Sequence, residues 1–410
     1  MAQQQTFVIV GASLAGAKAA QTLREEGFEG AVVLIGEEQV RPYDRPPLAK
    51  DYLMGKVGPE KVFIHPETWY AGHDVDLRLG VAVTAIDRDS REVALADGSR
   101  QRYDKLLLTT GSRVRRIPGT DLGGVHYLRR IEDSDALREA FVAGGQVAIV
   151  GAGWIGLEGA AAARYHGCAV TVIEPSAAPL LRVLGPEMGG MFADLHRENG
   201  VDLRLGVGLA EVRPGPFVVT DAGDEIAADA VLIGVGISPA VELAEQAGLE
   251  VDNGIRVTEL LQTTRDQDIY AAGDCMNADH PLYGRPIRVE HWANALNGGP
   301  AAARSMLGKG SPYARVPYFY SDQYDLGLEF SGWFEPDQVA RIVYRGDREK
   351  REFIAFWLGG DDRVLAGMNV NVWDVTDPIQ ALVRSQRPVD PAKLVDSDVP
   401  LADLRSASSI

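Results

Sequence analysis

Short apolar runs that lead into small residues divide the first half of the chain into repeated units. Phe7–Val10 is followed by Gly11-Ala12-Ser13-Leu14-Ala15-Gly16, and Val147–Val150 by Gly151-Ala152-Gly153-Trp154-Ile155-Gly156. Each run has the length of a buried strand, and helical spacing of apolar positions follows it. The pattern predicts crossover helices over about 14–26 and 155–166, and hence an α/β fold with parallel sheets.

The small residues of the two turns occupy the positions of a phosphate-binding fingerprint. The first glycine permits the tight turn, the middle small residue lets the backbone approach a pyrophosphate, and the last lets helix pack on strand. The helix N-terminus adds free N–H groups and a positive dipole end. The first copy has a serine in the middle position, and the second has all three glycines. The residues are Gly11, Ser13 and Gly16, then Gly151, Gly153 and Gly156.

An apolar strand that ends in an acid follows each turn. Glu37 lies 21 residues after Gly16, and Glu174 lies 18 residues after Gly156. Both spacings suit a carboxylate that accepts hydrogen bonds from a ribose 2′-hydroxyl, so the chain is predicted to bind two dinucleotides. Glu174 would repel a 2′-phosphate and so favours NADH over NADPH, a preference that Arg182 could soften.

Further apolar runs end at Thr110-Gly111, at Gly236 and at Gly273-Asp274, which places a carboxylate at the ligand-binding edge of a sheet. From about residue 317 the pattern alternates, predicting strands over 338–344, 352–358 and 364–370, a helix near 376–386 and a frayed terminus at 406–409. The predicted domains are a discontinuous Rossmann-like dinucleotide-binding domain (1–115 and 240–316), a second such domain (116–239) and a C-terminal α+β domain (317–410).

Composition narrows the functional classes. The net charge of −17 over 410 residues argues against a nucleic-acid partner. The two cysteines, Cys168 and Cys275, are far apart, so we expect buried thiols rather than a disulfide, a metal ligand set or a redox dithiol. The histidines show no ligand spacing, and no metal is expected. No apolar stretch approaches a membrane span and residues 1–5 do not read as a signal peptide, so the cytoplasm is the expected location.

Three charged residues remain open to a plain interpretation on these grounds. Arg45 and Lys50 lie in a proline-rich stretch, with a short helix expected from Leu48, and could be ordinary charges of a solvated loop. Glu158 lies near the start of the second crossover helix, where an acid is favourable through the helix dipole alone.

The motifs together resemble the two-dinucleotide flavoprotein reductases of the glutathione-reductase-like architecture. A narrower resemblance is to NADH-dependent ferredoxin reductases of the putidaredoxin reductase type, which serve bacterial oxygenases and cytochromes P450. It covers essentially the whole chain and is most specific at 45–50, 109–111, 271–274, 290–295 and 321–324.

The resemblance implies FAD in the first fingerprint and NADH in the second. Lys50 and Glu158 are implied as catalytic residues, near the flavin N5 region and the nicotinamide respectively. The implied FAD-binding residues are Gly11, Ser13, Ala15, Gly16, Glu37, Arg45, Lys50, Val83, Thr110, Gly111, Arg129, Asp274 and Trp292. The implied NAD-binding residues are Gly151, Gly153, Ile155, Gly156, Glu158, Glu174, Arg182 and Gly236.

The predicted function is electron transfer from NADH through FAD to a [2Fe–2S] ferredoxin that feeds a P450 or Rieske-type oxygenase. A rubredoxin reductase or an NADH oxidase would share nearly every motif, and an NADH-sensing flavoprotein resembling apoptosis-inducing factor is the alternative from another class. The expected oligomeric state is a monomer or a weak homodimer. Residues 281–320 carry five cations against Glu290 alone, which suggests a ferredoxin-docking face made of Arg285, Arg288, Arg304, Lys309 and Arg315.

Overall fold

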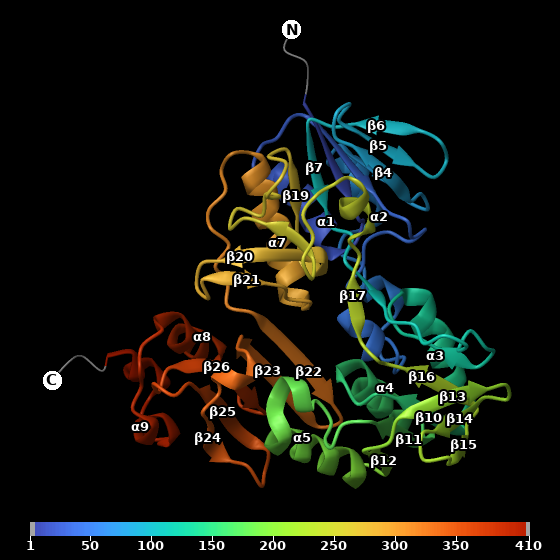
Figure 1. Cartoon of the computed structure of the whole chain (residues 1–410), viewed down its shortest axis with the longest axis vertical. Coiled ribbons are helices and arrows are strands. Elements are labelled where there is room, and N and C mark those ends of the chain that lie inside the picture. Colours follow the sequence, from blue (N-terminus) through green and yellow to red (C-terminus); the bar gives the residue numbers. More distant parts are fainter. Residues whose placement is uncertain (1–4, 407–410) are drawn as a thin grey trace.

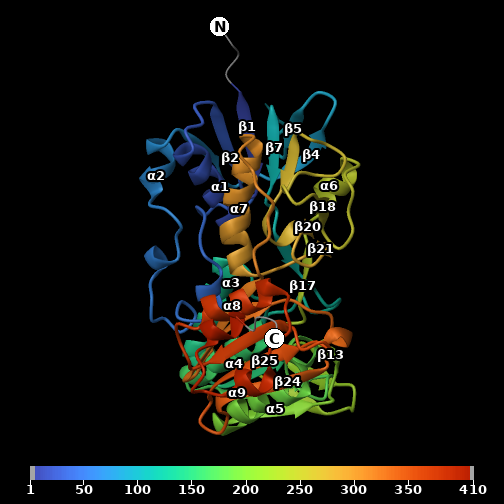
Figure 2. The same ribbon diagram turned by 90° about the vertical axis from the view of Figure 1, so that its left-hand side faces the viewer.

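The first sheet contains the first fingerprint strand at its centre. The computed structural model describes residues 5–406, and Figure 1 shows this sheet in the upper part of the molecule. Its five parallel strands run in the order β19 (Ile269–Ala271), β7 (Lys105–Leu108), β1 (Thr6–Val10), β2 (Ala31–Ile35) and β3 (Val75–Arg78). Helices α1 (Leu14–Glu25) and α7 (Trp292–Met306) lie side by side against it (Figure 2).

The second sheet repeats this arrangement around the second fingerprint strand. Its parallel strands run β12 (Val201–Leu205), β11 (Ala169–Glu174), β10 (Gln146–Val150), β16 (Ala230–Ile233) and β9 (Val125–His126). Helices α3 (Ile131–Ala143), α4 (Trp154–Tyr165) and α5 (Leu181–Glu198) pack around it. Helix α5 bends at Gly185, where a positive φ of 82° precedes Pro186.

The chain enters and leaves the second sheet through one antiparallel ribbon. Strand β8 (Ser112–Val114) pairs with β17 (Ile237–Pro239), which places Val114 opposite Ile237. Three small sheets complete the upper and right-hand parts of Figure 1. They consist of β4 (Val83–Asp87), β5 (Glu92–Leu95) and β6 (Arg100–Arg102); β13 (Leu209–Arg213), β14 (Phe217–Thr220) and β15 (Glu225–Ala227); and β18 (Ile255–Val257), β20 (Met276–His280) and β21 (Arg285–Ile287).

The third sheet is antiparallel and lies beside the second. Its strands run β22 (Tyr318–Gln323), β23 (Leu326–Gly332), β26 (Val364–Val370), β25 (Glu352–Leu358) and β24 (Arg341–Asp347). Helices α8 (Thr376–Ser385) and α9 (Pro391–Val395) pack on it. One apolar cluster includes Ile149 of the second sheet together with Phe330 and Trp357 of the third. The two sheets therefore share a core.

The α/β fold class is confirmed, with local differences. The helix expected from Leu48 is a single 3₁₀ turn, Pro46–Ala49, because Pro46 and Pro47 supply its first positions. The strand expected from residue 338 begins at Arg341, since Pro336–Gln338 form another 3₁₀ turn. The proposed domain boundaries remain a prediction. The expectation for the N-terminus rests on residues 1–5, of which 1–4 lie outside the described residues, and so does the expected fraying of 407–409.

Candidate functional site

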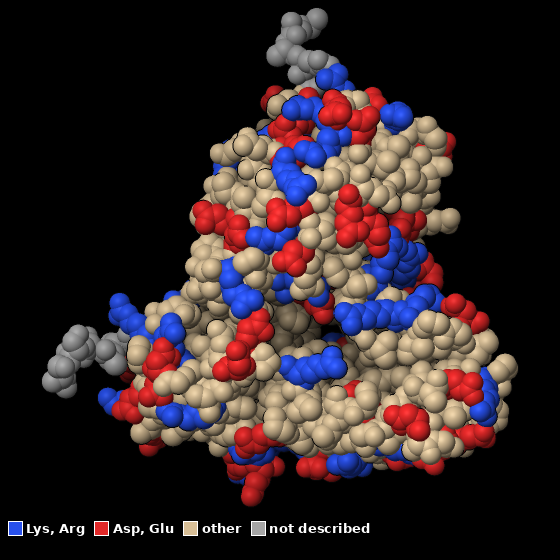
Figure 3. Space-filling model, viewed as in Figure 1, with Lys and Arg blue, Asp and Glu red and all other residues tan. Residues whose placement is uncertain are grey.

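A single cavity of about 1610 Å³ joins the two fingerprints. It exceeds the roughly 300–1,000 Å³ typical of a pocket for one drug-sized ligand. A hollow between the upper and lower parts of the molecule, with Lys and Arg side chains near its rim, is visible in Figure 3. Every predicted cofactor-binding residue lines the cavity except Gly16 and Gly156.

Those two glycines serve the packing role that the fingerprint assigns them. A Cβ on Gly16 would lie 2.1 Å from the Gly11 carbonyl oxygen, and one on Gly156 would lie 2.0 Å from that of Gly151. Gly11 itself has a φ of 119°, and its Cβ would lie 2.1 Å from the carbonyl oxygen of Thr109. No side chain larger than hydrogen fits at these positions without moving the backbone.

Both fingerprint helices present an uncapped N-terminus at the cavity. Helix α1 follows Ser13 and helix α4 follows Gly153, and neither N-cap residue makes a side-chain capping hydrogen bond. Neither helix has an acid in its first turn. The dipole interpretation of Glu158 is therefore wrong, because α4 begins at Trp154. The free N–H groups suit the pyrophosphates of two dinucleotides.

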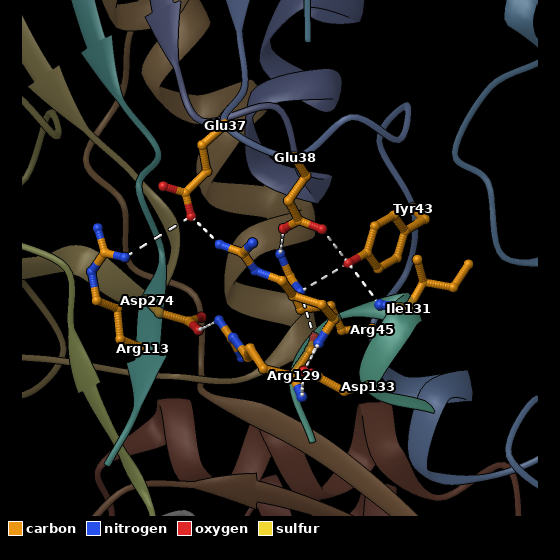
Figure 4. A network of polar contacts seen from close by, with 10 residues as sticks. Glu37, Glu38, Tyr43, Arg45, Arg113, Arg129, Ile131, Asp133 and Asp274 are labelled. Carbon is orange, nitrogen blue, oxygen red and sulfur yellow. Dashed lines mark hydrogen bonds and ion pairs between the residues drawn. The ribbon is translucent and has the colours of Figure 1, made fainter. Parts of the chain in front are cut away.

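The two acids that follow the second strand of each unit are held differently. Glu174 accepts hydrogen bonds from the backbone N–H groups of Ala152 (2.8 Å) and Ser176 (2.9 Å), which fix its carboxylate beside the second fingerprint. Glu37 forms an ion pair with Arg130, and Arg113 lies 4.0 Å from the same carboxylate oxygen (Figure 4). Nothing in the sequence around Glu37 signals that these two cations surround it.

A second network positions Arg129, Asp274 and Arg45. Asp274 Oδ2 accepts from Arg129 Nη2 and from the Ser112 hydroxyl, both at 2.9 Å, while Arg129 Nε is buried with no hydrogen-bond partner in the described part of the chain. Arg45 donates to Glu38 (2.8 Å) and to the Arg129 carbonyl (2.5 Å), as Figure 4 shows. Burial acts to lower the pKa of Arg45, but Tyr43 and Glu38 outweigh it and the net shift is upward. Arg45 is not a solvated loop charge.

Lys50 and Glu158 form a buried ion pair across the two units. Lys50 Nζ lies 2.5 Å from Glu158 Oε1, and the two side chains are 12% and 5% exposed. The Ser321 hydroxyl of β22 donates to the same oxygen at 2.7 Å. The solvated-loop interpretation of Lys50 is also wrong. The first fingerprint unit, the second unit and the third sheet therefore meet at one carboxylate.

Aromatic side chains line the remaining wall of the cavity. Trp292 donates from Nε1 to Asp44 (2.9 Å), and its ring meets that of Tyr320 edge-on at 6.0 Å. Burial raises the pKa of Asp44, although the bond from Trp292 opposes the shift. Trp154 Nε1 is buried and finds no hydrogen-bond partner among residues 5–406, while its ring packs against Phe319. The unpaired Trp154 and Arg129 donors suit a polar ligand in the cavity.

Several contributors were not assigned from sequence. Glu38 was adjacent to a predicted acid, and Ser321 lay in the 321–324 motif, but neither position signals a specific contact. Asp44 and Ser112 orient predicted residues from loop and strand positions with no periodic signature.

The five cations of the suggested docking face do not form one patch. Arg304 and Lys309 both bond Glu26, and Arg304 lies twelve residues along α7 from Trp292, about 18 Å by helical rise. Arg285 pairs with Glu335 and Arg288 with Glu290. Arg315 instead lines a second cavity of about 360 Å³, and Trp292 lines both cavities.

Neither of the two cysteines lines the large cavity. Cys168 and Cys275 are free and buried, as expected, and burial raises the pKa of each. No group of three or more His, Cys, Asp or Glu residues among residues 5–406 is arranged to hold a metal ion. No helix in the described part of the chain is long and apolar enough to cross a bilayer.

Comparison with known proteins agrees with this geometry over nearly the whole chain. The ferredoxin–NAD(+) reductase component of the anthranilate 1,2-dioxygenase system of Burkholderia cepacia is 43% identical over 402 residues, covering 96% of this chain and 98% of that protein. Putidaredoxin reductase of Pseudomonas putida is 37% identical, covering 100% and 98%. The crystal structure of the covalent putidaredoxin reductase–putidaredoxin complex matches with a TM-score of 0.93 at 36% identity, covering 98% of both chains.

The family assignments divide the chain at the start of the third sheet. Residues 318–405 match the reductase C-terminal family. Residues 5–299, which include both fingerprints and the Lys50–Glu158 pair, match a second family model, that of the pyridine nucleotide-disulphide oxidoreductases. The chain belongs to the pyridine nucleotide-disulphide oxidoreductase family.

Proposed function

We propose that this protein is an FAD-dependent NADH:ferredoxin oxidoreductase that supplies a [2Fe–2S] ferredoxin of a P450 or Rieske-type oxygenase system. The observation that carries the proposal is the single cavity in which both fingerprints meet at Lys50 and Glu158. When bound, FAD would supply the redox chemistry, namely acceptance of a hydride from NADH and release of single electrons. The protein supplies binding, orientation and exclusion of water.

The first-fingerprint side of the cavity suits FAD. The α1 N-terminus would hold the pyrophosphate, Glu37 the adenosine ribose, and Arg129 and Asp274 the ribityl and phosphate region. Lys50 would place its ammonium group beside the flavin ring, which Trp292 would border. A fixed cation there favours negative charge as it develops on the ring.

The second-fingerprint side suits NADH. The α4 N-terminus would hold its pyrophosphate and Glu174 the adenosine ribose, with exposed Arg182 on the rim. Glu158 uses Oε1 for Lys50 and Ser321, and no hydrogen bond within residues 5–406 involves Oε2, which could therefore accept from a carboxamide group. We also propose the domain division at 115/116, 239/240 and 316/317, and a monomer or weak homodimer in the cytoplasm.

Electrons would leave by way of Trp292 toward the second cavity. Trp292 borders both cavities, and the second is lined by two exposed arginines, Arg315 and Arg384, against one exposed acid, Asp377. An acidic ferredoxin is attracted by such a local charge even though the whole chain is acidic. We therefore propose Arg315 as the docking cation most closely tied to electron transfer, with Arg285 and Arg288 nearby and with Arg304 and Lys309 peripheral.

The deciding experiment measures NADH oxidation by the FAD-loaded protein with and without a [2Fe–2S] ferredoxin and cytochrome c. Slow oxidation in air that rises strongly with ferredoxin supports the proposal. Stimulation by rubredoxin alone would indicate a rubredoxin reductase, and fast oxidation in air that ignores both proteins would indicate an oxidase. Slow turnover throughout, with altered oligomerisation on reduction, would indicate a sensor.

The docking proposal has a matched pair of variants. Arg315→Glu is expected to raise the apparent KM for ferredoxin several-fold, because it reverses a charge beside the exit route. Arg304→Glu makes the same change at the far end of α7 and should have a smaller effect. Equal effects of the two variants, or none from Arg315→Glu, would exclude this docking site.

A further inference from the structure

A line of buried polar side chains leads from Glu158 into the interface between the second and third sheets. Ser321, Gln323 and Tyr324 lie at the end of β22 and in the turn that follows, and His196 lies in the last turn of α5. Ser321 is 1% exposed, and Gln323 and His196 are fully buried. Gln323 Nε2 lies 3.1 Å from Ser321 Oγ, Gln323 Oε1 lies 2.9 Å from His196 Nε2, and His196 Nδ1 lies 3.2 Å from the Tyr324 hydroxyl.

The direction of every hydrogen bond in this line follows from the carboxylate. An ionised Glu158 can only accept, so Ser321 must donate to it. The Ser321 oxygen then accepts from Gln323, whose amide nitrogen must face it, and the amide oxygen faces His196. His196 must therefore carry its proton on Nε2, which leaves Nδ1 to accept from Tyr324.

The line cannot serve as a proton path. An amide in the middle would have to give up a proton from nitrogen, which it does not do near neutral pH. His196 is neutral, since burial lowers its pKa to about 4. The four side chains instead form consecutive aligned dipoles that end on one oxygen, and such a line stabilises negative charge and fixes orientation.

We infer that Ser321, Gln323 and His196 are positioning residues that hold the Glu158 carboxylate on Lys50 with Oε2 free for the ligand, and that His196 is fixed as the Nε2–H tautomer by that charge. His196 belongs to the second unit, whereas Ser321 and Gln323 belong to the third sheet. The third sheet thus takes part in shaping the cofactor cavity. The kinetic part of this inference rests on the proposed hydride transfer, but the tautomer does not.

The first test reads the tautomer directly. Holoprotein with ¹⁵N-labelled histidine gives two ring-nitrogen signals for each of the seven histidines, and His196→Gln assigns the relevant pair. We expect a neutral Nε2–H ring for His196 at pH 7. A neutral Nδ1–H ring or a doubly protonated ring would overturn the inference, whatever the enzyme's activity.

The second test separates positioning from packing. Ser321→Ala is expected to slow flavin reduction at saturating NADH about tenfold, the loss of one charge-assisted hydrogen bond, with a much smaller change in the Kd of NAD⁺. Ser331→Ala is the matched control, because Ser331 is 2% exposed, lies on neighbouring β23 and bonds Gln380 Nε2, but does not reach Glu158. Ser331→Ala should change the rate of flavin reduction by no more than about twofold, which is well below the effect of losing one charge-assisted hydrogen bond.

A background variant completes the design. If Ser321 acts through Glu158, Ser321→Ala should add little to Glu158→Gln. Equal slowing in both backgrounds, or equal slowing by the Ser331 control, would show a general packing effect and overturn the positioning role. A protein that shows the expected tautomer but no NADH oxidation would refute the proposed function and leave the line of hydrogen bonds intact.

Discussion

The Lys50–Glu158 pair allows a quantitative test of how the three parts of the molecule are joined. The pair is almost fully buried, with a nitrogen–oxygen distance of 2.5 Å. Lys50→Met removes the cation and, among the described residues, leaves the carboxylate with the Ser321 hydroxyl as its one hydrogen-bond donor. Breaking a buried pair by removing one partner typically costs about 3–5 kcal/mol, because a charge stays buried without compensation.

That cost should appear in the thermal unfolding of the holoprotein. At roughly 2–4 °C per kcal/mol for a large domain, Lys50→Met is expected to lower the Tm by about 10 °C. Glu158→Gln in the same protein removes the unpaired buried charge. The free energy of unfolding lost in the double variant should therefore be smaller, by about 2 kcal/mol or more, than the sum of the losses in the two single variants. Two signals follow the unfolding transition: the flavin fluorescence that rises when FAD is released, and circular dichroism. Flavin reduction by NADH should also slow in Lys50→Met.

The double-mutant cycle can contradict this reasoning in a simple way. Losses that add within about 0.5 kcal/mol would mean that the two side chains do not interact energetically. Unchanged flavin reduction in Lys50→Met would separately exclude a role for the cation in the reaction.

Three further predictions address the cofactor sites and the buried histidine. Gly299→Ala should lower FAD content, since its Cβ would lie 2.1 Å from the Ala15 carbonyl oxygen in the first turn of α1, whereas Gly190→Ala, which meets no atom within 4 Å, should retain FAD fully. Glu174→Gln should raise the NADPH/NADH ratio of kcat/KM about tenfold by removing charge repulsion, and an unchanged ratio would contradict that role. The pKa of His196 is lowered to about 4 from 6.5, so between those values the unfolded state binds more protons and stability falls as the pH falls. Denaturation at a series of pH values should show up to about 3 kcal/mol of this loss, and His196→Gln should flatten the slope.

The parts of the fold that the sequence predicts well are those in which local pattern and tertiary role coincide. Both fingerprints, their strands and their crossover helices appear where the apolar runs and glycines place them, because backbone geometry itself requires those residues. The strands at 352–358 and 364–370 likewise match their periodic segments. Such elements carry their own signal.

Contacts between distant segments carry no such signal. Lys50 and Glu158 are 108 positions apart, and Ser321 lies a further 163 positions from Glu158, so their meeting depends on how three sheets pack. The suggested docking face failed to form one patch for the same reason: nearness in sequence placed Arg304 and Arg315 together, but α7 carries Arg304 to its far end. Charge counts along a chain ignore the pairing that folding creates, as with Glu26.

The ribbon formed by β8 and β17 gives the molecule a modular construction. Val114 and Ile237 are opposite each other in an antiparallel pair, so everything between them starts and finishes at nearly the same point, about 4.5–5.5 Å apart. The segment between them therefore joins the rest of the backbone at one place, and no strand of the first sheet lies within it. Recombination at such a junction offers a route by which a flavin-binding scaffold could acquire a different coenzyme specificity in one step.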